Sequence, residues 1–168
     1  MDEAPVKDFF LKPGHVFLPV EPTLISTVVS SGIAVTLYDF RKGMGGMASY
    51  LEPVRPQHVL STPVYACPAI IGLIQMFRKI GSRMEHLEAQ LFGGSENELM
   101  SGFVAGLGEK NIEAALEILD REGIRVAGQD VGGYRGRKVV FQSATGEALA
   151  ARVNAIRKKD WYPSRQAI

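Results

Sequence analysis

The order of strand-like and helix-like patterns constrains the fold of this chain more than any other feature. Residues 24–29 and 33–38 are apolar and rich in β-branched side chains, which predicts two buried strands. The other expected elements are an edge strand at 16–20, a hairpin strand at 45–51, a helix from Pro68 to Gly81, a strand at 87–91, a helix at 109–122, and strands at 124–127, 138–142 and 147–153. Because the strands come in runs, this order favours a mixed α+β domain over a doubly wound sheet.

The length of 168 residues suits one domain with a substantial core. We expect a flexible N-terminal lead-in at residues 1–15, the domain itself at 16–153, and a basic C-terminal tail at 154–168. The tail carries four basic residues and one acid, namely Arg157, Lys158, Lys159, Arg165 and Asp160. It is either a solvated tail or a segment that docks on a partner.

Charge and hydropathy exclude some classes of function. The net charge of +1 gives no overall electrostatic attraction to nucleic acid or to an anionic membrane. No apolar run approaches the roughly 18 to 20 residues that span a bilayer. The acidic, polar start does not resemble a signal peptide. The single cysteine, Cys67, rules out an internal disulfide, so we expect a cytoplasmic protein.

Four separated stretches carry a family resemblance. They are Thr27 to Asp39, against a pattern T-L-L-G-S-C-V-A-V-x-L-Y-D; Gly45 to Pro53, against G-G-M-N-H-x-x-L-P; Leu87 to Gly94, against L-E-A-K-x-F-G-G; and Gly108 to Glu113 followed by Asp130 to Arg137, against G-x-R-N-x-E and D-x-G-G-N-x-x-R. Together they cover residues 16–153 in the right order. In these stretches the chain resembles the CheD family, the receptor glutamine deamidases of bacterial chemotaxis.

The resemblance implies a fold, an activity and partners. The fold would be a β-sandwich flanked by helices, related to toxin deamidases and cysteine hydrolases. In the family, a cysteine attacks the side-chain amide of a receptor glutamine and water releases glutamate, while a histidine forms the thiolate and a threonine supports it. The expected partners are the cytoplasmic helices of chemoreceptors and a CheC-type phosphatase. No cofactor or metal is implied.

Two of the three family positions hold different residues here. The family cysteine falls on Gly32 and the family histidine on Ser49, while the threonine falls on Thr27, or on Ser26 in an alternative spacing. Loss of the nucleophile from such a unit typically costs around a million-fold in rate. The substitutions therefore predict a catalytically degenerate homologue.

Few residues offer a substitute. Ser31 adjoins the vacated position but needs a base, and Ser49 occupies the base position. Cys67 sits at a helix start, where the helix dipole could lower the pKa of a thiol, but a small, partly buried packing residue is the plainer interpretation. The histidines at 15, 58 and 86 lack metal-ligand spacing. The glycine pairs 45–46, 93–94 and 132–133 match no phosphate-binding motif and predict turns with positive φ.

A small basic cluster follows the last glycine pair. Arg135, Arg137 and Lys138 form either a solvated strand end or a contact for an acidic receptor helix or partner. Three functions thus remain open: a degenerate CheD protein that binds receptor or partner, an active protein-glutamine deamidase with an unrecognised nucleophile, and an unrelated binding role on the inherited fold.

Overall fold

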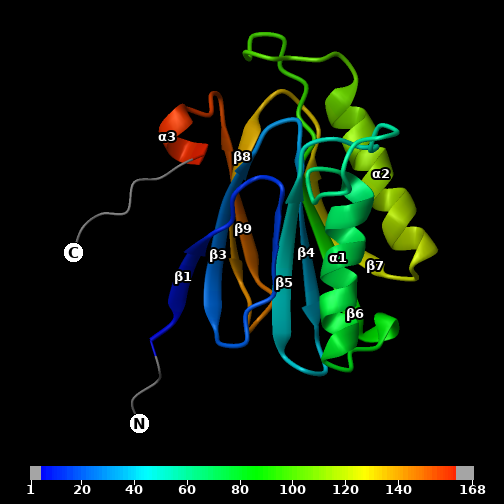
Figure 1. Ribbon diagram of the computed structural model, residues 1–168. Helices are drawn as coiled ribbons and strands as arrows, with labels where there is room; N and C mark the ends of the chain where they lie inside the picture. The colour runs from blue at the N-terminus through cyan, green and yellow to red at the C-terminus, as the bar shows by residue number, and fades with distance from the viewer. Residues whose placement is uncertain (1–4, 162–168) are drawn as a thin grey trace.

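The molecule is built from two stacked sheets and a layer of two long helices (Figure 1). The computed structural model describes residues 5–161. The strands are β1 (Lys7–Phe10), β2 (His15–Phe17), β3 (Thr23–Val29), β4 (Ile33–Asp39), β5 (Met44–Tyr50), β6 (Leu87–Gly93), β7 (Arg125–Val131), β8 (Gly136–Gln142) and β9 (Ala148–Val153). The helices are α1 (Ala66–Lys79), the short 3-10 turn η1 (Met84–His86), α2 (Leu107–Arg121) and α3 (Lys158–Trp161).

The two sheets divide the strands by their pairing. One sheet has the order β1-β3-β8-β9 and the other the order β2-β5-β4-β6-β7. All pairs are antiparallel except β1 with β3 and β6 with β7. Figure 1 shows α1 and α2 side by side on the outer face of the five-stranded sheet. These facts confirm the α+β class and the sandwich flanked by helices.

Alternating side chains on β4 create two cores. Ile33, Val35 and Leu37 join the cluster beneath the helices, whereas Ala34 joins the cluster between the sheets. Successive residues of a strand point to opposite faces, so β4 contributes to both layers and is buried on both sides. This explains why its sequence is almost continuously apolar.

The main expected elements are confirmed, with shifted boundaries. Helix α1 begins at Ala66, so Pro68 is its third residue, a place where the missing N–H still costs no intrahelical bond. Strand β7 extends to Val131 because it pairs with the full length of β6. The glycines at 45–46 were wrongly expected in a turn: they lie within β5, where the lack of side chains admits Phe141 on one face and Leu73 on the other. The pairs at 93–94 and 132–133 do have positive φ.

Residues 5–15 fall in the segment expected to be a flexible lead-in, and they include ordered elements. Residues 7–10 form β1, which pairs in parallel with β3, and the side chain of Leu11 is buried in the inter-sheet core. Burial of Leu11 and the added strand hold this segment against the sandwich. The domain limits at 16 and 153 stay a prediction.

The described part of the C-terminal tail also makes contacts. Asp160 accepts a hydrogen bond from Lys138 on β8 at 2.9 Å and one from the backbone N–H of Arg157 at 2.8 Å. Together these bonds hold down the pKa of Asp160, the backbone bond contributing most. Arg165 lies outside the described residues. Among residues 5–161, no helix has the length and hydropathy needed to span a membrane.

Candidate functional site

The connection between β3 and β4 is held in place by the end of β6. The backbone N–H of Gly94 donates to the carbonyl oxygen of Gly32 at 2.9 Å, and that of Ser95 donates to the carbonyl oxygen of Ser30 at 2.9 Å. The hydroxyls of Ser30 and Ser95 lie 3.2 Å apart. Residues 30–32 are therefore fixed by backbone contacts that do not depend on a side chain at position 32.

Asn111 on α2 ties this turn to the end of β5. Its Nδ2 donates to the carbonyl oxygen of Ser31 at 2.9 Å and to that of Leu51 at 3.0 Å. The hydroxyl of Tyr50 donates to the carbonyl oxygen of Asn111 at 2.5 Å. Burial raises the pKa of this phenol, so it remains a neutral donor. The asparagine is fully buried and joins three segments distant in sequence.

A pocket of about 200 Å³ lies over Gly32. The turn contributes two serines to its wall, and the loop between β6 and α2 contributes both polar and apolar side chains. Its lining residues are Ser30, Ser31, Gly32, Leu51, Ser95, Asn97, Met100, Ser101, Gly102, Phe103 and Val104. Neither Tyr50 nor Tyr134 lines it, so the space above Gly32 is not filled by these rings.

The backbone at Gly32 leaves no room for a side chain. An ideal Cβ placed on Gly32 would lie 2.5 Å from the carbonyl oxygen of Tyr50 and 3.3 Å from Cδ2 of Leu51. Real Cβ atoms do not approach backbone oxygen that closely. A cysteine at this position would require the adjoining ends of β4 and β5 to separate.

Ser49 is buried in β5, two residues along the ladder from Gly32. Its Cα pairs with Ala34 on one side and His15 on the other, and alternation along β5 places its side chain on the same face as Met47, between the sheets. The side chain is completely buried, and its Oγ has no hydrogen-bond partner among the described residues. A hydroxyl so placed has no solvent access for proton exchange.

Thr27 and Ser26 lie on opposite faces of β3. The hydroxyl of Thr27 is buried between the sheets and donates to the carbonyl oxygen of Leu11 at 2.8 Å. Ser26 is half-buried on the other face. Gly32 thus lies directly before β4 and Ser49 lies on the neighbouring strand β5, while the Thr27 hydroxyl donates to the N-terminal segment.

The other candidate residues are scattered. Cys67 is exposed near the start of α1, contrary to the partly buried position expected. His15 and His58 are exposed, and His86 is the last residue of η1 and lies beside Phe40, with ring centroids 5.7 Å apart. Within residues 5–161, no group of three or more His, Cys, Asp or Glu side chains is arranged to hold a metal ion.

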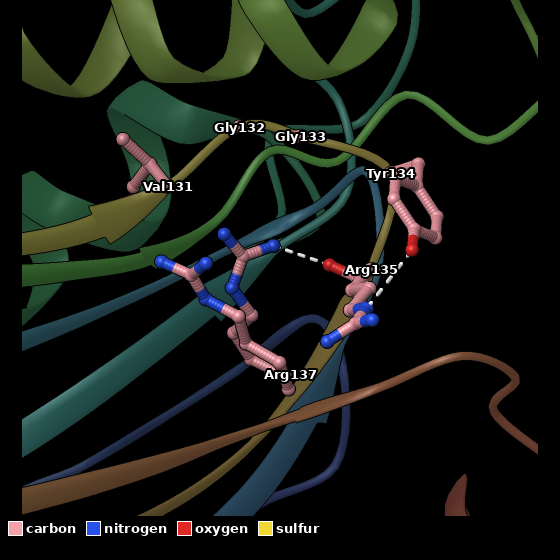
Figure 2. A pocket seen from close by; sticks show the side chains of 7 residues that line it. Val131, Gly132, Gly133, Tyr134, Arg135 and Arg137 are labelled. Carbon is pink, nitrogen blue, oxygen red and sulfur yellow. Dashed lines mark hydrogen bonds between the residues drawn. The ribbon is translucent and has the colours of Figure 1, made fainter.

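A second pocket, of about 260 Å³, lies at the turn between β7 and β8. Figure 2 shows Arg135, Arg137 and Tyr134 around it, with Gly132 and Gly133 above. The basic cluster is only partly solvated, because Arg137 is 2% exposed. Lys138 lies apart from this pocket and pairs with Asp160.

Comparison with known proteins decides the family. A family model described as CheD chemotactic sensory transduction matches residues 54–152, more than half of the chain. The chain belongs to the CheD family. The stretch matched by the CheD model begins after both Gly32 and Ser49.

Curated CheD relatives cover nearly the whole chain. A protein from Trichlorobacter lovleyi named probable chemoreceptor glutamine deamidase CheD is 38% identical over 90% of this chain and 94% of its own length. Relatives with the same kind of name from Geobacter sulfurreducens and Sulfurimonas denitrificans are 35% and 36% identical over 86% and 83% of this chain, and 89% and 90% of their own lengths.

Sequence reasoning missed the role of Asn111. It stands in the fourth CheD-like stretch, and an asparagine inside an otherwise amphipathic helix was the available signal. A buried amide in such a place needs partners from elsewhere in the fold. Only the structure shows that the partners are the two backbone segments flanking Gly32.

Proposed function

We propose that this chain is a CheD-family chemotaxis protein that has lost deamidase chemistry and acts by binding. Its binding partners would be the cytoplasmic helices of a chemoreceptor or a CheC-type phosphatase. The observation that carries the proposal is the backbone packing at Gly32, which excludes a nucleophile at the family's cysteine position.

The proposed loss of activity follows from what amide hydrolysis requires. A nucleophile must reach the amide carbon and a base must take its proton. Gly32 provides no nucleophile, and Ser49 is a buried hydroxyl that cannot act as a base near neutral pH. Ser31 faces the same missing base, and its carbonyl oxygen is occupied by Asn111.

The proposed binding role is supported by exposed apolar side chains on two loops at the end of the molecule that carries the pocket over Gly32. On the loop between β6 and α2, Leu99 is 95% exposed and Val104 is also exposed. The loop between β5 and α1 exposes Val54 and Leu60. Both loops lie at the upper end of the molecule in Figure 1, the end that carries the 30–32 turn. Exposed apolar side chains gathered at one end of a molecule suit the apolar face of an amphipathic partner helix.

Intact-mass and peptide mass spectrometry test the loss of activity. Purified chemoreceptor cytoplasmic fragment is incubated with this protein or with the Trichlorobacter lovleyi relative as a reference. We expect glutamine-to-glutamate conversion with the relative alone. Conversion that scales with the amount of this protein overturns the proposal and favours the alternative, an active glutamine deamidase that uses an unrecognised nucleophile.

A binding assay tests the other half of the proposal. Receptor fragment and a CheC-type protein are titrated against the wild type, Leu99→Asp and Val20→Asp. Val20 is 90% exposed in the connection between β2 and β3, away from the pocket, and serves as the matched control. Binding that Leu99→Asp weakens and Val20→Asp preserves supports the proposal. If the wild type binds neither the receptor fragment nor the CheC-type protein, the proposed binding role is overturned in favour of an unrelated role.

A further inference from the structure

The pocket between β7 and β8 is a second site, distinct from the one over Gly32. The segment Gly93–Glu96 separates them: Gly94 donates to Gly32 on one side, and Glu96 donates to the carbonyl oxygen of Gly133 at 2.8 Å on the other. The residues that line the second pocket are Val131, Gly132, Gly133, Tyr134, Arg135, Arg137 and Arg152. Three of these seven carry a positive charge and none carries a negative one.

One neighbouring carboxylate leaves this charge only partly balanced. Asp130 accepts hydrogen bonds from Arg152 at 2.9 Å and from Arg137 at 3.2 Å. Burial raises the pKa of Asp130, but these two guanidinium groups more than offset it and hold the pKa below its ordinary value. Asp130 is therefore ionised near neutral pH, and the site retains a net positive charge.

Arg137 forms the base of the pocket and has spare donor capacity. Its side chain is 2% exposed, its Nη1 donates to the carbonyl oxygen of Arg135, and its Nε has no partner among the described residues. A guanidinium has five N–H donors, and a buried cation whose donors are incompletely matched is costly. A bound anion would reduce that cost.

The guanidinium of Arg135, at the edge of the pocket, is held in place by Tyr134. The Nε of Arg135 donates to the hydroxyl of Tyr134 at 3.2 Å, and its guanidinium lies 5.4 Å from the centre of that ring, as Figure 2 shows from close by. A cation held over an aromatic face keeps its orientation at little cost. Arg135 and the exposed Arg152 thus flank the buried Arg137.

We infer that this arginine pocket binds an oxyanion group, a carboxylate or a phosphate, through Arg135, Arg137 and Arg152. Planar guanidinium groups match both oxyanions in geometry. The inference stands independently of how the site over Gly32 behaves, because the two pockets share no lining residue.

Titration followed by amide NMR tests the site. The probes are glutarate and inorganic phosphate, each added to the wild type at constant low ionic strength, with the amides of Gly132 and Gly133 as reporters. We expect saturable shifts with at least one probe, and roughly tenfold weaker binding in the double variant Arg135→Gln with Arg152→Gln. Arg125→Gln removes an exposed arginine at the far end of β7 and should bind as the wild type does.

The outcomes separate the sources of the oxyanion. Stronger binding of glutarate identifies an acidic side chain as the natural ligand, and stronger binding of phosphate identifies a phosphoryl group or free phosphate; comparable affinities support a general oxyanion site. The inference is overturned if neither probe shifts these amides, or if the double variant binds as tightly as Arg125→Gln does.

Discussion

Gly32 lies so close to Tyr50 that a Cβ on Gly32 would stand 2.5 Å from the Tyr50 carbonyl oxygen. The absence of a side chain is therefore a packing requirement of this backbone. The register of β4 with β5 pairs Ile33 with Tyr50, directly beside this contact. The two strands thus close directly beside Gly32.

Gly32→Ala should destabilise the fold. The new methyl group must displace backbone atoms, and overpacking of this kind typically costs about 1–3 kcal/mol. Gly72→Ala is the matched control, because Gly72 lies inside α1 with nothing within 4 Å of its ideal Cβ. That substitution should stabilise by about 0.5–1 kcal/mol. Urea unfolding measures the free energy of unfolding of both variants. Equal changes in the two variants would contradict the packing argument.

The double variant Gly32→Cys with Ser49→His should not acquire deamidase activity. The cysteine needs β4 and β5 to separate, and a histidine at position 49 must enter a fully buried space between the sheets. Mass spectrometry of receptor fragment measures conversion, while circular dichroism checks that the variant folds. Conversion by a folded double variant would show that the scaffold can still accept the family's chemistry.

Ser49→Ala should stabilise the protein slightly. The buried Oγ of Ser49 has no hydrogen-bond partner among the described residues, and such a group typically costs about 1–3 kcal/mol. Ser82→Ala also removes a serine hydroxyl, but this one donates a hydrogen bond to Oδ2 of Asp39 at 2.5 Å. Its loss should therefore destabilise the protein. Thermal melts should therefore shift in opposite directions, and a loss of stability in both variants would contradict the prediction.

Asn111→Ala should destabilise strongly and disturb the pocket over Gly32. The substitution leaves the carbonyl oxygens of Ser31 and Leu51 without their donor and opens a cavity in a buried place, for a combined cost of about 2–4 kcal/mol. Asn154→Ala, at an exposed position directly after β9, is the control. Amide hydrogen exchange should show faster opening of residues 30–33 in Asn111→Ala alone.

Asp39 should make the fold sensitive to acid. Burial raises the pKa of its carboxylate, but the Ser82 hydroxyl and the backbone N–H groups of Lys42 and Arg41 outweigh burial and lower the pKa. A carboxyl group with a lowered folded pKa stabilises above its unfolded pKa, about 3.9, and this contribution fades as the pH falls below that value.

Asp39→Asn tests this prediction. The variant should be less stable than the wild type by about 1–3 kcal/mol at pH 7, and the difference should shrink on acidification toward pH 3. Asp120→Asn, at an exposed site near the end of α2, should leave the pH profile unchanged. A gap between wild type and Asp39→Asn that stays constant from pH 7 to pH 3 would contradict the role of the carboxylate.

The sequence predicted most of the fold because its patterns are local. Alternation in residues 87–91 and the helical stripe of Ile112, Leu116 and Leu119 follow from residues a few positions apart. Strand β1 was missed because its stabilising partner is β3, and no local pattern reveals a parallel pairing to another segment. The hairpin strand predicted at residues 45–51 corresponds to β5 (Met44–Tyr50), although a glycine pair such as 45–46 is also typical of a turn.

The geometry of the candidate site could not be predicted from the sequence. Gly32 and Ser49 followed from the family pattern, but the close approach of Tyr50 to Gly32 is a contact between strands. Likewise, Arg137 lies in a basic stretch that suits a solvated strand end, yet its burial depends on β7, β9 and the turn between β7 and β8. Exposure of a charged side chain is a property of the assembled fold.

The pairing of β1 with β3 has a practical consequence for anyone who shortens this protein. A version that begins at residue 16, where sequence patterns place the domain, would leave one side of β3 without its parallel partner and the Thr27 hydroxyl without its acceptor at Leu11. An uncovered apolar strand edge invites pairing with other chains. Residues 7–11 thus cover the edge of β3 and should limit self-association through it.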